Sequence, residues 1–106
     1  FYAPHGPFTP ASEFAQHYPD TPAGKYRALL NQLDHNVGRV LDHLAAIGAL
    51  RNTIVVLISD NGGSNAAIDS NSPFAGTKAT LTEGGMRVPL VIRWPDASLN
   101  GQVISD

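Results

Sequence analysis

The feature that most constrains this sequence is a long amphipathic segment followed directly by a short, continuously apolar run. The run TIVVLIS, residues 53–59, is rich in β-branched side chains and does not alternate between apolar and polar residues. This pattern favours a strand that is covered on both faces, as in a parallel sheet. The run ends abruptly in Asp60, Asn61, Gly62 and Gly63. Polar groups are therefore expected at the very end of a buried strand.

The segment before this run has the spacing of an amphipathic helix. We predict a helix of about six to seven turns over residues 24–47. Gly48 is a plausible stop, because glycine readily adopts the left-handed conformation at a helix C-terminus. Gly38 lies inside the pattern and costs about 1 kcal/mol relative to alanine, so we expect close packing there. The apolar stripe consists of Tyr26, Leu29, Leu30, Leu33, Val37, Val40, Leu41, Leu44 and Ile47.

The rest of the chain completes an α/β pattern. Residues 1–3 resemble the end of a strand, and RVPLVIRWP contains a second apolar strand near 88–94. Residues 62–87 show neither helix nor strand period, so we expect a long loop or short ribbon, which in a compact domain is usually functional. We predict one sheet from strands near 1–3, 53–59 and 88–94, with the helix on one face. Strand, helix and strand would form a right-handed βαβ unit, while the direction of the 88–94 strand stays open.

Composition excludes several classes of function. The chain has 106 residues, which is one domain at most, and its net charge of -2 gives no reason to expect a nucleic acid or an anionic membrane as partner. It has no cysteine, which excludes disulfides, thiolate metal sites and a cysteine nucleophile within these residues. No apolar window reaches the length of a membrane span. Because the first residues lack a leader or an initiator Met and the last lack a capping signal, we expect an internal piece of a longer protein, truncated at both ends.

The polar end of the 53–59 strand is the first candidate site. Ligands of open α/β sheets bind outside the carboxyl ends of the strands, where Asp60 and Asn61 would lie. Carboxylate and carboxamide oxygens suit Ca²⁺ or Mg²⁺ rather than zinc. Gly62 and Gly63 would let another segment come close. The alternative is an ordinary turn, since Asp-Asn-Gly-Gly is also a common turn composition.

Two further clusters could face the same rim. His5, in APHGPF, follows the expected first strand and could act as an acid or a base near neutral pH; the alternative is a solvated loop histidine. Lys78, in GTKATLTEGGMRVP, could meet an anionic substrate, or could simply be exposed. Glu83, before two glycines, could bind backbone amides at the turn into the last strand. Phe8 could line a substrate pocket or only pack its loop.

Taken together, the three clusters resemble the C-terminal part of the catalytic domain of the type I, formylglycine-dependent sulfatases, which belong to the alkaline-phosphatase-like superfamily. YAPHGPF resembles the family's histidine loop, and LDHNVGRVLDHLAAIGALRNTIVVLISDNGG resembles its helix-to-metal segment. GTKATLTEGGMRVPLVIRWP resembles the segment that carries its lysine and Glu-Gly-Gly. The resemblance covers almost the whole chain, in order.

The resemblance implies a role for each candidate residue. Asp60 and Asn61 match two ligands of the family's divalent cation, normally Ca²⁺. Lys78 matches the lysine that contacts the sulfate group, and His5 matches the histidine beside the sulfate and the leaving oxygen. The implied activity is hydrolysis of a sulfate ester, and the implied location is exported: periplasmic, secreted or lysosomal.

The family's nucleophile arises from cysteine, or sometimes serine, in a Cys-X-Pro-X-Arg-type motif. This chain lacks that motif, and it lacks the family's tandem acidic ligands. We therefore expect both upstream, and expect residues 1–106 alone to be inactive and to self-associate through exposed sheet edges. Two alternatives stay open. One is a phosphonate or phosphate ester hydrolase of the same superfamily; the other is a degenerate, non-catalytic binding protein.

Overall fold

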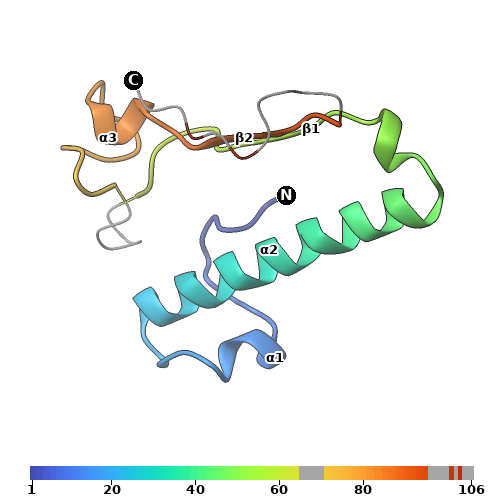
Figure 1. The fold of residues 1–106 in the computed structure, drawn as a ribbon. Helices are drawn as coiled ribbons and strands as arrows, with labels where there is room; N and C mark the ends of the chain where they lie inside the picture. Colours follow the sequence, from blue (N-terminus) through green and yellow to red (C-terminus); the bar gives the residue numbers. More distant parts are fainter. Residues whose placement is uncertain (65–70, 96–100, 102, 104–106) are drawn as a thin grey trace.

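The computed structural model describes residues 1–64, 71–95, 101 and 103. Within them, the elements follow in the order α1 (Ser12–Ala15), α2 (Pro22–Ala46), the 3₁₀ helix η1 (Leu50–Asn52), β1 (Val55–Ile58), α3 (Glu83–Met86) and β2 (Leu90–Arg93). Figure 1 shows α2 as one arm, joined through η1 to a second arm that holds the two strands and α3. None of the described helices combines the length and the apolarity needed to cross a membrane.

Helix α2 confirms the long helix expected from the apolar stripe. Thr21 caps its N-terminus by accepting a hydrogen bond from the Gly24 amide at 3.1 Å, and Pro22 occupies the first turn, where its missing N–H costs nothing. The helix ends before Gly48, whose φ of 73° is the left-handed conformation that glycine adopts most easily. The prediction for Gly38 was wrong, because a Cβ there would meet nothing within 4 Å.

Helix α1 and the N-terminal loop pack on the first half of α2. The Phe8 and Tyr26 rings meet edge to face at 5.5 Å between centroids, and Phe14 and His35 lie 5.5 Å apart. The Gln32 Oε1 atom accepts a hydrogen bond from the Ala11 amide at 3.0 Å. Ala28 and Leu29 of α2 are the buried apolar residues of the described chain, so its core lies in this arm.

Strands β1 and β2 pair antiparallel, which settles the direction that the sequence left open. Val55 lies opposite Arg93 and Ile58 lies opposite Leu90. The Arg93 guanidinium donates to the Leu50 carbonyl at 3.1 Å, which ties β2 to η1. This pairing places the end of β1 beside the start of β2.

Three expectations about the sheet were wrong. Residues 1–3 form no strand, so no βαβ unit is present in the described residues. No Cα atom of α2 lies within 8 Å of a Cα atom of β1 or β2, so the helix does not pack directly on the sheet. Three of the four β1 side chains, those of Val56, Leu57 and Ile58, are exposed rather than covered. The region 62–87 also contains the short helix α3, where no helix was expected.

Candidate active site

Asp60 and Asn61 lie in the turn that leaves β1. The Ser59 amide donates to the Pro89 carbonyl at 3.3 Å, which carries the strand pairing to the start of this turn. The Ser59 hydroxyl donates to the Asn61 carbonyl at 2.8 Å, and the Asn61 Nδ2 donates to the Gly62 carbonyl at 2.9 Å. Asp60 is exposed and Asn61 is half-buried. Both residues therefore lie just after the strand, two and three positions beyond its end at Ile58.

The oxygens of these two side chains suit a hard cation. In the part of the chain that the structure describes, neither the Asp60 carboxylate nor the Asn61 Oδ1 takes part in a hydrogen bond or an ion pair. Ca²⁺ takes about six to eight oxygen ligands, so these two residues would supply only part of a coordination shell. Among the same residues, no group of three or more His, Cys, Asp and Glu side chains could hold a metal by itself.

Lys78 lies in a tight turn. The Thr80 amide and the Thr80 hydroxyl both donate to the Thr77 carbonyl, at 3.1 and 2.6 Å, which closes a four-residue turn with Lys78 in second place. Ala79, in third place, has a φ of 69°, which is strained for a residue with a Cβ. The Lys78 side chain is exposed. The hydrogen bonds of the turn fix the Lys78 backbone, and its exposed side chain leaves the ammonium accessible to an anion.

Backbone contacts join this turn to the end of β1. The Lys78 amide donates to the Gly63 carbonyl at 2.9 Å, and the Gly62 amide donates to the Gly85 carbonyl at 3.0 Å. A Cβ built on Gly62 would collide with the Gly84 carbonyl, so the two glycine pairs meet through their backbones. The segments that carry Asp60, Asn61 and Lys78 therefore form one cluster.

Asn71 is a member of this cluster that the sequence did not reveal. Its Oδ1 accepts from the Gly63 amide at 2.7 Å, and its Nδ2 donates to the carbonyls of Gly63 and Gly76 at 2.9 and 3.0 Å. Asn71 lies in a loop without periodicity, where one asparagine cannot be told from the others. The signal that could have found it is the small, glycine-rich surroundings, which leave backbone groups for a side chain to pair.

His5 lies in the N-terminal loop. Its amide donates to the Tyr2 carbonyl at 3.0 Å, and its ring Nδ1 lies 2.7 Å from the Gly6 carbonyl oxygen. Because a carbonyl only accepts, Nδ1 carries a proton and Nε2 is left for another partner. The ring is exposed and lies 5.2 Å from the Tyr2 ring. No hydrogen bond within the described residues links His5 to the cluster of Asp60, Asn61 and Lys78.

Within the described residues, the Glu83 carboxylate binds no backbone amide, so the expectation for it was wrong. Glu83 opens α3, and its carboxylate accepts from the Arg87 guanidinium at 3.3 Å. The same guanidinium lies 4.4 Å above the Phe74 ring, within the range of a cation–π contact. Glu83 thus holds Arg87, and with it the loop around Phe74, rather than the turn itself.

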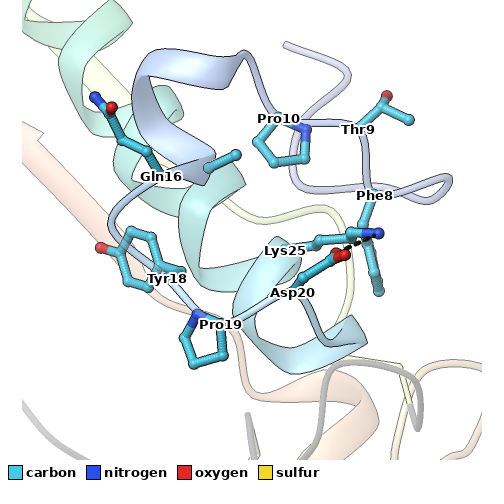
Figure 2. Close-up of a pocket in the computed structure, with 9 residues that line it drawn as sticks. Phe8, Thr9, Pro10, Gln16, Tyr18, Pro19, Asp20 and Lys25 are labelled. Carbon is cyan, nitrogen blue, oxygen red and sulfur yellow. Dashed lines mark ion pairs between the residues drawn. The ribbon is translucent and has the colours of Figure 1, made fainter.

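A hollow of about 530 Å³ lies away from these residues, between α1, the loop at residues 8–10 and the start of α2 (Figure 2). Phe8 lines this hollow and also packs on Tyr26, and none of the four candidate residues lines it. Lys25 and Asp20 form an ion pair of 2.8 Å at its edge. The hydrogen bond from Lys25, and then its charge, lowers the pKa of Asp20.

Known proteins resemble this chain in both sequence and fold. The family model described as Sulfatase matches residues 1–105. N-acetylgalactosamine-6-sulfatase of Mus musculus is 38% identical over 84 residues, which cover 76% of this chain and 16% of that protein. Steryl-sulfatase of Rattus norvegicus is 37% identical over 91 residues, 78% of this chain and 16% of that protein. A sulfatase of Formosa agariphila is 42% identical over 78 residues, 66% of this chain and 14% of that protein.

Solved structures agree. The crystal structure of Ps i-CgsB in complex with k-i-k-neocarrahexaose superposes with a TM-score of 0.82 at 31% identity, over 89% of this chain and 22% of that one. These matches show part of an alkaline-phosphatase-like fold. The chain belongs to the sulfatase family. It spans about a sixth of the length of the curated relatives named above.

Proposed function

We propose that this chain is one part of the catalytic domain of a sulfuric ester hydrolase and forms one side of its active site. The observation that carries the proposal is the backbone cluster, in which the bond from the Lys78 amide to the Gly63 carbonyl joins the cationic segment to the strand end that bears Asp60 and Asn61. A cation site near an ammonium can offset the negative charge on the three non-bridging oxygens of a sulfate ester. Membership of the sulfatase family supports the same reaction.

Asp60 and Asn61 would hold a divalent cation, Ca²⁺ by the chemistry of their oxygens. Such a cation offsets negative charge on the sulfuryl oxygens when it is bound. The Asp60 carboxylate contributes a full charge, and the Asn61 Oδ1 contributes a neutral oxygen whose direction is set by the hydrogen bond from its Nδ2 to the Gly62 carbonyl. The remaining ligands would come from outside residues 1–106.

Lys78 and His5 would act on the substrate. The Lys78 ammonium has three donors and can bind sulfuryl oxygens while their charge grows. With Nδ1 engaged by the Gly6 carbonyl, His5 offers Nε2 toward a substrate, and a protonated Nε2 could donate to the leaving oxygen. The nucleophile, a formylglycine in this family, would come from another segment, because this chain lacks the Cys-X-Pro-X-Arg-type motif. By the same family resemblance, we propose an exported protein.

The test uses the complete protein that contains this chain. We expect it to hydrolyse p-nitrophenyl sulfate, and we expect Lys78→Ala to lower kcat/KM about 100- to 1,000-fold, the loss typical of one donor to a developing oxyanion. Lys25→Ala is the matched control, because Lys25 is an exposed lysine paired with Asp20; its activity should match that of the unmodified protein.

Two outcomes would contradict the proposal. Hydrolysis of p-nitrophenyl phosphate without hydrolysis of the sulfate would favour a phosphate ester hydrolase of the same superfamily. Equal losses in Lys78→Ala and Lys25→Ala would remove the reason to place Lys78 at the sulfate.

A further inference from the structure

The Asn71 carboxamide uses nearly all of its capacity for hydrogen bonds. It exchanges two hydrogen bonds with Gly63, accepting from the Gly63 amide at 2.7 Å and donating to the Gly63 carbonyl at 2.9 Å. Its second Nδ2 proton goes to the Gly76 carbonyl at 3.0 Å. An asparagine side chain has two donors and one acceptor oxygen, so the whole group is committed to backbone partners on two segments.

Those two segments are the ones that carry the proposed site. Gly63 lies two residues after Asn61, and Gly76 lies two residues before Lys78. The Gly63 carbonyl accepts both from Asn71 and from the Lys78 amide, at 2.9 Å each. One side chain thus holds the same peptide group to which the Lys78 backbone is bound. Within the described residues, the hydrogen bond from the Lys78 amide to the Gly63 carbonyl is the only direct one between the lysine turn, residues 77–80, and the end of β1.

We propose that Asn71 is a positioning residue, which fixes Lys78 relative to Asp60 and Asn61 and thereby sets the reach of the ammonium toward a sulfate on the cation. The proposal rests on the proposed function. Asn71 does not touch the substrate; it acts through Lys78. Because a displacement of about 1 Å at a reacting group can cost about 100-fold in rate, a loosened clamp should lower turnover.

Asn71→Asp is the informative variant. Aspartate keeps the size and the acceptor for the Gly63 amide, but it cannot donate. It also sets a carboxylate oxygen against the carbonyls of Gly63 and Gly76, where the amide now donates. Asn52→Asp is the matched control: Asn52 is exposed, and its side chain makes no hydrogen bond within the described residues. Both variants add the same charge.

The experiment is a double-mutant cycle in the complete protein, with p-nitrophenyl sulfate as substrate. We expect Asn71→Asp to lower kcat by about 10- to 100-fold and to leave the Ca²⁺ affinity unchanged, because both cation ligands stay on their own turn. Combined with Lys78→Ala, the same change should have little further effect, since residues that act through one another are not additive. Asn52→Asp should match the unmodified protein in both backgrounds.

Equal losses from Asn71→Asp with and without Lys78 would overturn the positioning role, because a purely structural defect does not depend on Lys78. If Lys78→Ala itself has no effect, the proposed function fails instead, so the two failures are distinguishable. Amide hydrogen exchange gives a readout without activity: the Lys78 amide should exchange faster in Asn71→Asp than in Asn52→Asp. An unchanged exchange rate of the Lys78 amide would overturn the positioning role of Asn71. If Asn71→Asp does not fold, Asn71→Ser takes its place under the same criteria.

Discussion

Gly62, Gly84 and Gly85 form a contact in which there is no room for any side chain. A Cβ on Gly62 would meet the Gly84 carbonyl, and a Cβ on Gly84 or Gly85 would meet carbonyls of the 75–80 loop. The glycines therefore do more than permit turns: they let the end of β1, the lysine turn and α3 share one backbone cluster. This close approach brings the end of β1, which bears Asp60 and Asn61, against α3, which in turn contacts the loop that bears Lys78.

We predict that Gly62→Ala in the complete protein lowers the free energy of unfolding by about 1–3 kcal/mol, the usual cost of forcing extra atoms into a packed site, and lowers turnover with it. Gly38→Ala is the control, because a Cβ there is unobstructed and alanine in a helix interior gains about 1 kcal/mol over glycine. Thermal unfolding measures the stability of each variant, and kcat measures its turnover. A Gly62→Ala protein as stable and active as the unmodified one would contradict the close packing.

Residue types alone left each candidate open, because Asp60 and Asn61 also suit an ordinary turn and Lys78 could simply be exposed. The resemblance to a known family singled these residues out, and neither it nor the residue types predicted how their segments contact one another. Asn71 could not be selected, because its importance comes only from three backbone groups that the fold brings to it. The Nδ1 proton of His5 likewise follows from the Gly6 carbonyl, a contact that no spacing rule predicts.

At the scale of elements, α2 was predictable because its signals are local. An apolar stripe, the Thr21 cap and Gly48 all lie within the helix or next to it, and the observed span Pro22–Ala46 differs from the predicted 24–47 only at its ends. Pro22 extends the start because a proline is tolerated in the first turn. The prediction of close packing at Gly38 was wrong, since a glycine in a helix can simply face open space.

The sequence predicted where the two strands lie, but it did not predict how they pair. An apolar run without alternation indicates a strand that can be covered on both faces, and it does not say which strand lies beside it or in which direction. β1 and β2 pair antiparallel, and residues 1–3 form no strand, so the expected crossover unit is absent from the described residues. The pairing of β1 with β2 depends on contacts between segments about 35 residues apart, beyond the reach of local pattern.

At the scale of the whole molecule, the chain exposes an unusually large surface. A compact monomer of this mass exposes about 5,700 Å², whereas this chain exposes 7935 Å². Many of the exposed large apolar side chains lie on the two-stranded sheet and beside it. The exposed large apolar residues there are Ile54, Val56, Leu57, Ile58, Leu90, Val91, Ile92 and Trp94. Such a surface is typical of one that other chain segments cover.

We therefore predict that residues 1–106, produced alone, self-associate, bind a hydrophobic dye and hydrolyse no p-nitrophenyl sulfate. Exposed apolar strands with open edges pair with other copies, and the chain lacks the Cys-X-Pro-X-Arg-type motif in which a formylglycine could form. Sedimentation velocity over a range of concentrations measures the association, with the complete protein as the control. A monomeric chain that unfolds cooperatively would contradict this prediction, and turnover above background would contradict the missing nucleophile.

The central claim is that the oxygens of Asp60 and Asn61 bind a hard cation beside Lys78. Calorimetric titration of the metal-free complete protein with Ca²⁺ tests it most directly. We predict that Asp60→Asn, which removes one charge from the ligand set, weakens Ca²⁺ binding about tenfold or more, or about 1.4 kcal/mol. Asp34→Asn, the same change on the exposed side of α2, should bind like the unmodified protein. Equal Ca²⁺ affinity in Asp60→Asn and the unmodified protein would contradict the account.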